Sequence, residues 1–315
     1  MIKTPLCDLL GIEYPIFQGG MAWIADADLA AAVSNGGGLG IIAAANANAD
    51  WLRGQIRKAK QLTDKPFGVN IMLMSPFAAE VAEVVIDEGV PVVTTGAGNP
   101  GKYMKAWQEA GIKVIPVVPS VSMAKLLARS GASALIAEGG ESGGHIGEIT
   151  TMALVPQVCD AVDIPVIAAG GIADGRGIAA AFMLGAVGVQ VGTRFLVADE
   201  CNVHENYKNK VLKAKDTDTM TTGKRLGHPV RSLKNSYSRA YLVKEYDSTV
   251  SDEELEQLGV GALRLAAVEG DEKKGCFLCG QIAGLVKKKQ PAAEIIREMF
   301  IQADNVLGGA GEWRK

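Results

Sequence analysis

The sequence has few aromatic residues, few cysteines and no excess of basic charge. Phe, Trp and Tyr together make up 5% of the 315 residues, and only five cysteines and three histidines are present. The formal net charge of −3 argues against a nucleic-acid-binding protein whose affinity depends on a global positive field. An odd, small number of cysteines in a large apolar chain indicates reduced thiols and a cytoplasmic protein.

The sequence also lacks an apolar segment typical of a signal peptide or a membrane span. Lys3, Asp8 and Glu13 interrupt the first 25 residues. The longest uncharged run, residues 29–49, is broken by Ser34, Asn35 and three consecutive glycines, which favours a buried helix followed by a strand. We therefore expect no association with a membrane.

Glycine and apolar residues, by contrast, are abundant. The chain has 38 glycines and 48% hydrophobic residues against 21% charged ones, enough to form one large core. No collagen-like period or Gly/Ser linker is present, so the glycine excess indicates loops in which the backbone turns tightly.

Eight short apolar segments predict the fold class. They lie at residues 16–18, 40–42, 68–71, 92–94, 114–117, 134–137, 166–168 and 188–191. Each is apolar on both faces, as is typical of strands buried in a parallel sheet, and the spacing leaves room for a helix after each. Ser122 and Asp174 are suited to cap two of these helices. Eight such units favour an α/β fold of the (β/α)8 TIM barrel type.

An open doubly wound sheet is the alternative architecture. Its dinucleotide-binding form carries Gly-x-Gly-x-x-Gly in the first turn. The first turn here is Gln18-Gly19-Gly20-Met21 and lacks that spacing, so the barrel is the better interpretation.

The composition changes after Phe195. Residues 199–261 hold 11 acidic and 10 basic side chains, and from Tyr207 to Lys244 there are ten basic and two acidic ones. We predict that residues 199–261 form a smaller helical cap, inserted after the eighth strand of a barrel formed by residues 1–198 and 262–315. A solvated helical surface or a subunit contact would explain the same composition.

The loops after the seventh and eighth strands predict a phosphate site. They contain Gly170-Gly171 and Gly192-Thr193, at the two positions where barrel enzymes commonly bind phosphate. Glycine lets several backbone N–H groups approach an anion, and a helix N-terminus adds partial positive charge. The alternative is that these glycines only close tight barrel turns.

The loop after the sixth strand carries a candidate catalytic histidine. Glu138 begins this segment, and Gly143 and Gly144 precede His145. An imidazole at the rim of a barrel can donate a proton or a hydrogen bond to a developing oxyanion. His204 and His228 fall in the cap, where we expect them to be exposed, and the three histidines form no metal-binding pattern.

Two further segments are candidates for ligand contact. Asn70 ends the third strand, where its amide can both donate and accept hydrogen bonds, and the Gly19-Gly20-Met21 turn would allow a flat ligand to approach the backbone. Capping of a barrel turn and a tight strand-to-helix connection are the respective alternatives. Cys276 and Cys279 have the spacing of a redox or zinc site, but no second pair accompanies them, and we interpret them as ordinary thiols.

Taken together, Gly19-Gly20-Met21, Asn70, Gly143-Gly144-His145, residues 169–172 and residues 190–193 resemble a known family. It is the flavin-binding barrel family of nitronate monooxygenases and FMN-dependent enoyl-acyl-carrier-protein reductases. The resemblance extends over the whole chain, including residues 228–231 and 280–284. The nitronate branch commonly has Gln where this chain has Glu138, which favours the reductase.

The resemblance implies FMN as cofactor and NADPH or NADH as co-substrate. The phosphate of FMN would lie on Gly171, Gly192 and Thr193. The residues expected around the cofactor as a whole are Gly19, Gly20, Met21, Asn70, Glu138, Gly143, Gly144, Gly170, Gly171, Gln190, Gly192 and Thr193. No metal site is implied, although a monovalent cation activates members of the family.

The implied reaction is reduction of a trans-2-enoyl thioester carried by acyl carrier protein in fatty-acid synthesis. The flavin accepts a hydride from the nicotinamide and passes it to the substrate, and His145 assists at the thioester. Arg231, Lys234 and Arg239 are candidate contacts for the anionic carrier or the 2′-phosphate of NADPH, and a homodimer is expected. The alternatives are a nitronate monooxygenase and a flavin-binding barrel without turnover.

Overall fold

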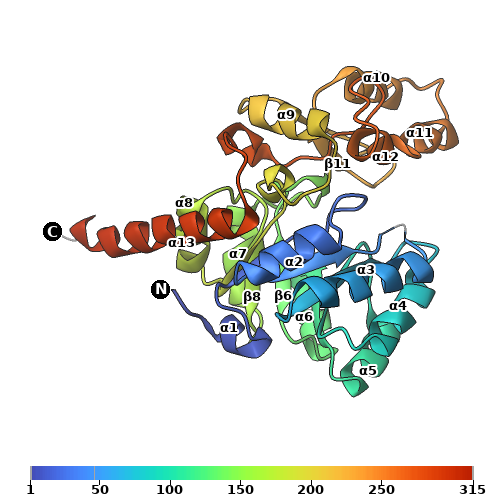
Figure 1. Cartoon of the computed structure of the whole chain (residues 1–315). Helices are drawn as coiled ribbons and strands as arrows, with labels where there is room; N and C mark the ends of the chain where they lie inside the picture. The colour runs from blue at the N-terminus through green and yellow to red at the C-terminus, as the bar shows by residue number, and fades with distance from the viewer. Residues whose placement is uncertain (1, 46, 314–315) are drawn as a thin grey trace.

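Eight parallel strands form the centre of the part of the chain that the computed structural model describes, residues 2–45 and 47–313 (Figure 1). The strands are β1 (Ile16–Gln18), β2 (Gly40–Ala43), β3 (Phe67–Met72), β4 (Val92–Gly96), β5 (Lys113–Val118), β6 (Leu135–Glu138), β8 (Val166–Ala169) and β9 (Gly188–Val191). Their order is β1-β9-β8-β6-β5-β4-β3-β2. A parallel bridge between Phe17 and Leu39 links the two ends of this order. The predicted (β/α)8 barrel is therefore confirmed.

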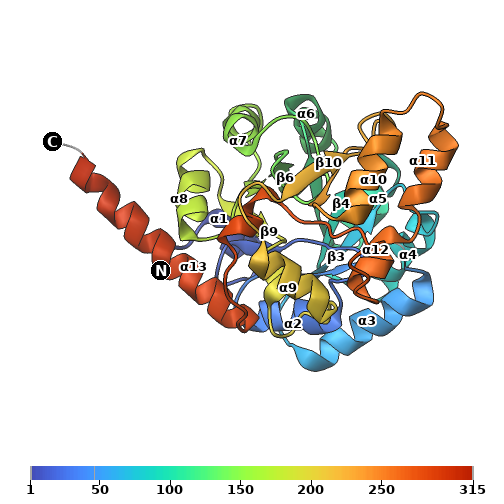
Figure 2. The same cartoon turned by 90° about the horizontal axis from the view of Figure 1, so that it is seen from above.

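Helices surround the barrel, as the view from above shows (Figure 2). They are α2 (Ala27–Asn35), α3 (Ala49–Leu62), α4 (Ala78–Asp87), α5 (Gly101–Glu109), α6 (Val121–Arg129), α7 (Thr151–Cys159) and α8 (Gly175–Met183). Asp174 caps α8 as predicted. The prediction for Ser122 was wrong: Ser120 is extended and accepts from the N–H of Met123, whereas Ser122 lies in the first turn of α6.

Side chains fill the barrel interior at the end opposite the cap. Helix α1 (Pro5–Leu10) places Leu6 and Leu10 against a buried cluster that includes Phe17, Ile136 and Ile167. Since this end is packed, space for a ligand is left at the C-terminal ends of the strands, as in other barrels of this type.

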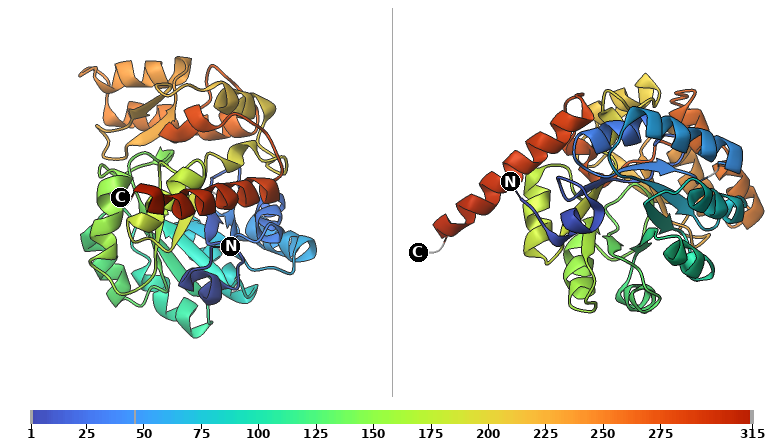
Figure 3. Two further views of the ribbon diagram at one scale, coloured as in Figure 1. Left: turned by 90° about the vertical axis from the view of Figure 1, so that its left-hand side faces the viewer. Right: turned by 60° about the horizontal axis from the view of Figure 1, so that its bottom comes forward.

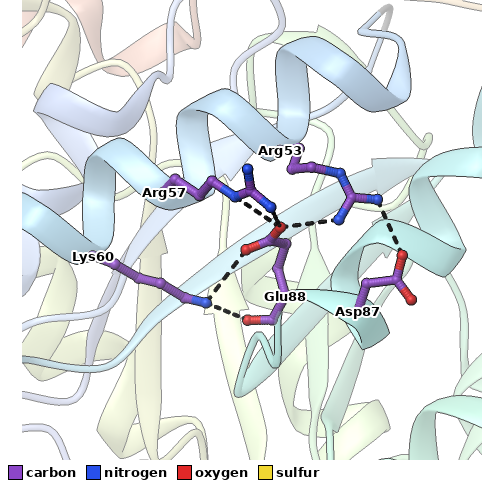
Figure 4. Close-up of polar contacts among 5 residues, drawn as sticks. All are labelled: Arg53, Arg57, Lys60, Asp87 and Glu88. Carbon is purple, nitrogen blue, oxygen red and sulfur yellow. Dashed lines mark hydrogen bonds and ion pairs between the residues drawn. The ribbon is translucent and has the colours of Figure 1, made fainter.

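An ion-pair cluster joins α3 to the end of α4 (Figure 4). The carboxylate of Glu88, whose side chain is 9% exposed, lies 3.0 Å from Arg53, 2.9 Å from Arg57 and 3.6 Å from Lys60, and Arg53 also pairs with Asp87. Burial acts to raise the pKa of Glu88, but the hydrogen bonds from Arg57 and Arg53 hold it below its usual value. The cluster fixes two neighbouring outer helices.

The cap lies over one end of the barrel (Figures 1 and 3). It contains α9 (Glu205–Lys213), α10 (Ser236–Glu245) and α11 (Asp252–Gly259), but also an antiparallel hairpin of β10 (Thr219–Thr222) and β11 (Val230–Leu233). The expectation of a purely helical cap is thus corrected. Strand β11 also pairs with β7 (Gly144–His145), in the loop after β6, so the hairpin joins the cap to the barrel rim.

The chain returns to the barrel later than the expected residue 262. Helix α12 (Ala262–Ala267) packs on α11, and the 3-10 helix η2 (Gln281–Leu285) packs on α9. Helix α13 (Ala292–Gly309) then packs against α8 and α2. Charged residues continue beyond residue 261, for example at residues 269–274, so the composition does not mark where the chain packs back on the barrel. Within the described residues, no helix is both long enough and apolar enough to cross a lipid bilayer.

Candidate active site

A cavity of about 270 Å³ lies at the C-terminal ends of the barrel strands. Tyr207, Leu263 and Leu278, from beyond the barrel strands, contribute to its wall. Thirteen residues that the sequence analysis selected line this one cavity: Gly19, Gly20, Met21, Asn70, Glu138, Gly143, Gly144, His145, Gly170, Gly171, Gln190, Gly192 and Thr193. The structure therefore brings these residues together from segments up to 174 positions apart in the sequence.

The turns after β8 and β9 present unused hydrogen-bond donors. Gly170 and Gly171 have φ of +87° and +73°, a backbone conformation that glycine adopts without strain. Within the described residues, the N–H groups of Gly171, Gly192 and Thr193 donate no hydrogen bond, although all three residues line the cavity. Thr193 is buried, Gly192 is half-buried and Gly171 is exposed, so these donors are open to a ligand in the cavity. Free backbone donors on two neighbouring turns suit an anion such as a phosphate.

The turn after β1 is held close to β3. A Cβ atom on Gly20 would lie 2.4 Å from the Cβ of Asn70, so only glycine fits there. Asn70 donates a hydrogen bond of 3.0 Å to the hydroxyl of Thr94. The buried amide of Gln18 accepts from the N–H of Ile41 and donates to the carbonyl of Gly19, which fixes the turn from beneath. The sequence did not predict this role of Gln18, because it does not indicate which groups form hydrogen bonds with a Gln inside an apolar strand.

Glu138 places a carboxyl group in the cavity wall at the end of β6. The residue is half-buried, and this burial raises its pKa to about 7. A carboxyl with such a pKa exists in both protonation states at neutral pH, so it can donate as well as accept a hydrogen bond.

His145 also lines the cavity and remains accessible to water. It pairs with Val230 of the cap, and the N–H of the next residue, Ile146, donates to the carbonyl of Pro229. Partial burial, together with the charge of His228, holds the pKa of His145 below its ordinary value of 6.5. The imidazole is therefore neutral at neutral pH, with one N–H available as donor and one nitrogen as acceptor.

Two residues at the site were missed by the sequence analysis. The carboxylate of Glu141 accepts hydrogen bonds from the N–H and the hydroxyl of Thr151, the first residue of α7. Two features of the sequence could have drawn attention to these residues: Thr151 precedes a helical segment, and Glu141 lies in a glycine-rich loop. The sequence does not indicate that they meet.

Of the three cationic side chains expected to contact substrate or partner, Arg231 lies apart from the other two. Arg231 donates two hydrogen bonds to the carbonyl of Gly140 and so supports the loop that carries His145. Lys234 and Arg239 lie instead in a separate shallow pocket of the cap, together with Lys210 and Lys273.

Cys276 and Cys279 are unpaired and buried. Burial raises the pKa of each thiol to about 12. Burial therefore favours the protonated thiols at neutral pH, and the interpretation of the pair as ordinary thiols stays a prediction.

The fold and the position of the cavity define a barrel enzyme whose site is built from the loops after the strands and covered by a cap. The chain belongs to the nitronate monooxygenase family, whose model matches residues 3–85 and 78–302. It is 50% identical to FabK from Thermotoga maritima, with a TM-score of 0.97, over 99% of this chain and all of that one.

Two curated relatives differ in the activity that they carry. A dehydrogenase of a hydroxylated octahydroindene-carboxyl-CoA from Mycobacterium tuberculosis is 44% identical over 78% of this chain and 69% of its own length. A probable nitronate monooxygenase from Staphylococcus saprophyticus is 33% identical over 97% of this chain and 99% of its own length. The names agree on an oxidoreductase and differ in the substrate.

Proposed function

We propose that the protein is an FMN-dependent enoyl-acyl-carrier-protein reductase that uses NADPH or NADH. The observation that carries this proposal is the set of free N–H groups on Gly171, Gly192 and Thr193 in the wall of the cavity. They would bind the phosphate of FMN, while Gly19, Gly20 and Asn70 would admit the flat ring. When bound, FMN would supply a two-electron carrier between the nicotinamide and the enoyl thioester.

His145 and Glu138 provide the polar chemistry of the proposed reaction. As a neutral donor, His145 would hydrogen-bond the thioester oxygen as negative charge develops on it. The protonated fraction of the imidazole would give the proton that Cα requires and would become neutral. Glu138 would hold the edge of the ring in either of its protonation states. The cap residues Leu263 and Leu278 would limit the access of water to the cavity.

A thioester substrate is supported by two of the relatives. The name of the Mycobacterium tuberculosis protein includes a CoA thioester. The 50% identity to FabK supports the reductase branch of the family. An acyl carrier protein presents its thioester on a phosphopantetheine arm attached to an acidic surface. The shallow pocket is lined by Lys210, Lys234, Arg239 and Lys273 but also by Asp271 and Glu272, and Lys210 pairs with Glu272 at 2.9 Å. Its remaining excess of two positive charges would attract such a surface.

The deciding experiment is anaerobic. Purified protein is loaded with FMN, and its visible absorption is followed after addition of NADPH or NADH and then of crotonyl thioester. We expect loss of the flavin absorption with the nicotinamide and its recovery with the thioester. A protein that no pyridine nucleotide bleaches is not this reductase.

The second candidate is a nitronate monooxygenase, favoured by the family match and the Staphylococcus relative. In that case an alkyl nitronate, rather than a nicotinamide, bleaches the bound flavin, and oxygen restores it. The homodimer, the monovalent cation and the cytoplasmic location stay predictions. Sedimentation of the purified protein and assays with K⁺ or Na⁺ address the first two.

A further inference from the structure

The loop after β6 and the first residue of α7 form a hydrogen-bonded bridge beneath the proposed phosphate turn. Both carboxylate oxygens of Glu141 lie within hydrogen-bond distance of the Thr151 N–H, at 3.1 and 2.9 Å, and one lies 2.9 Å from its hydroxyl. Thr150, the N-cap residue of α7, makes no capping bond with its own side chain. Glu141 therefore caps α7 from a distant position in the loop, where its negative charge is favoured by the helix dipole.

The Thr151 hydroxyl continues the bridge to the turn itself. Its single proton has three acceptors within hydrogen-bond distance: the carbonyl oxygens of Gly170 at 3.0 Å and Ala169 at 3.2 Å, and the Glu141 carboxylate at 2.9 Å. A Cβ atom on Gly170 would approach the Thr151 hydroxyl to 3.1 Å, and a Cβ on Gly171 would lie 3.5 Å from the Glu141 side chain. Together with the carbonyl oxygen of Gly139, which would lie 2.7 Å from a Cβ on Gly170, Thr151 and Glu141 contact the two left-handed glycines.

Glu141 is itself held in place from two further sides. Its backbone carbonyl accepts a 2.9 Å hydrogen bond from the N–H of Gln281, and the next residue upstream, Gly140, is held by Arg231. Gly280, next to Gln281, donates 2.9 Å to the hydroxyl of Thr193. The two turns with free donors are therefore connected through the Glu141 loop and residues 280–281.

We infer that Glu141 and Thr151 are positioning residues that hold the turn after β8 in the shape needed to bind the phosphate of the cofactor. Neither is required to touch the phosphate. A carboxylate close to an anion opposes its binding, so its presence here is explained by the geometry it imposes and not by direct contact. This inference rests on the proposed function, because it assumes that the bound anion is the phosphate of FMN.

The test compares FMN with riboflavin, which lacks the phosphate. Dissociation constants are measured by flavin fluorescence on the apoprotein. In Thr151→Val, which removes the hydroxyl at nearly constant volume, we expect the FMN dissociation constant to rise about tenfold, while the riboflavin constant changes less than about twofold. Thr151→Ser, which keeps the hydroxyl, should restore FMN affinity. The matched control is Thr150→Val, at the neighbouring exposed threonine, which should change neither constant.

Glu141 supplies a second, independent pair of variants. Glu141→Ala should weaken FMN as Thr151→Val does, and Glu141→Gln, which keeps an acceptor oxygen for the Thr151 N–H, should stay within about threefold of the wild type. If Glu141→Ala or Thr151→Val does not fold, as judged by near-ultraviolet circular dichroism, the other pair decides by the same criterion.

Two results would overturn the inference. One is a folded Thr151→Val or Glu141→Ala protein with unchanged FMN affinity. The other is an equal loss of FMN and riboflavin affinity, which would indicate a general structural role. Neither result contradicts the proposed function as long as the wild-type protein binds FMN. A wild-type apoprotein that does not bind FMN refutes the proposed function and the inference together.

Discussion

His145 and Val230 are paired across an antiparallel sheet in which a barrel loop and a cap hairpin meet. The only candidate acid of the imidazole type in the cavity wall is therefore held by the cap, and not by the barrel alone, within the residues that the structure describes. Movement of the cap hairpin would move His145 with it, so the cap would influence the chemistry proposed for His145.

Replacement of His145 tests its role at the thioester. In His145→Ala we expect turnover of crotonyl thioester to fall by about a hundredfold to a thousandfold, the usual effect of losing a donor to a developing oxyanion, with flavin content unchanged. The control is His204→Asn, because asparagine can keep the capping bond that His204 makes with the N–H of Asn206. Near-normal turnover of His145→Ala would remove the histidine from the mechanism.

The pKa of His145 should respond to its neighbour in the cap. Burial lowers this pKa most, and the charge of His228 lowers it further. In His228→Asn the repulsion between two imidazolium ions is absent, so the pKa of His145 should rise while staying below 6.5, because the burial remains. NMR titration of the His145 ring protons measures it, and an unchanged or lower value would contradict the assignment.

The stability of the apoprotein should depend on pH through Glu138. Its pKa of about 7 in the folded chain exceeds the ordinary 4.5, so the folded state binds the extra proton between these values. The corresponding stabilisation is fully present below pH 4.5 and is lost as the pH rises through 7. Since water reaches the cavity, we expect Glu138→Gln to be more stable than the wild type by about 1–2 kcal/mol at pH 8 and equal to it near pH 4.

Urea unfolding at several pH values between 4 and 8 measures this difference. Glu148→Gln, which changes an exposed glutamate of the same loop, is the control and should show no pH-dependent gain. A Glu138→Gln protein that follows the wild-type pH profile would show that folding does not raise the pKa of Glu138.

The close approach of Gly20 to Asn70 predicts a strong effect of one methyl group. In Gly20→Ala the new Cβ would lie 2.4 Å from the Asn70 Cβ, so the turn must move, and we expect a loss of about 1–3 kcal/mol in unfolding free energy together with reduced flavin binding. The control is Gly54→Ala in α3, where no atom lies within 4 Å of the added methyl group and helix propensity favours alanine. Equal behaviour of the two variants would contradict the tight packing of the turn.

The ion-pair cluster on α3 and α4 predicts a difference between two adjacent carboxylates. The side chain of Glu88 is nearly buried and forms ion pairs with three cationic side chains. The side chain of Asp87 is 57% exposed and pairs with Arg53. We expect Glu88→Gln to destabilise the protein by about 1–2 kcal/mol and Asp87→Asn by less than about 0.5 kcal/mol. Chemical denaturation measures both, and the effect of Glu88→Gln should diminish at high salt.

The sequence by itself determined the barrel and most of the candidate site. The eight strands are short segments of consecutive apolar residues, and this pattern predicts burial of both faces of each strand. The turns after β1, β8 and β9 are marked by glycines that follow directly on those strands. Since parallel strands all end at the same rim, residues such as Asn70, His145 and Thr193 could be placed together before any contact was known.

Only the tertiary structure decided which side chains these turns rest on and how the cap is attached. The Glu141–Thr151 bridge reaches the turn after β8 through the Thr151 hydroxyl. The support of Gly140 by Arg231 and the contact of Gly280 with Thr193 join residues that are 91 and 87 positions apart. The hairpin of β10 and β11 depends in the same way on its pairing with β7. A buried polar group forms its hydrogen bond with whichever partner the fold brings near, and the local sequence does not identify that partner.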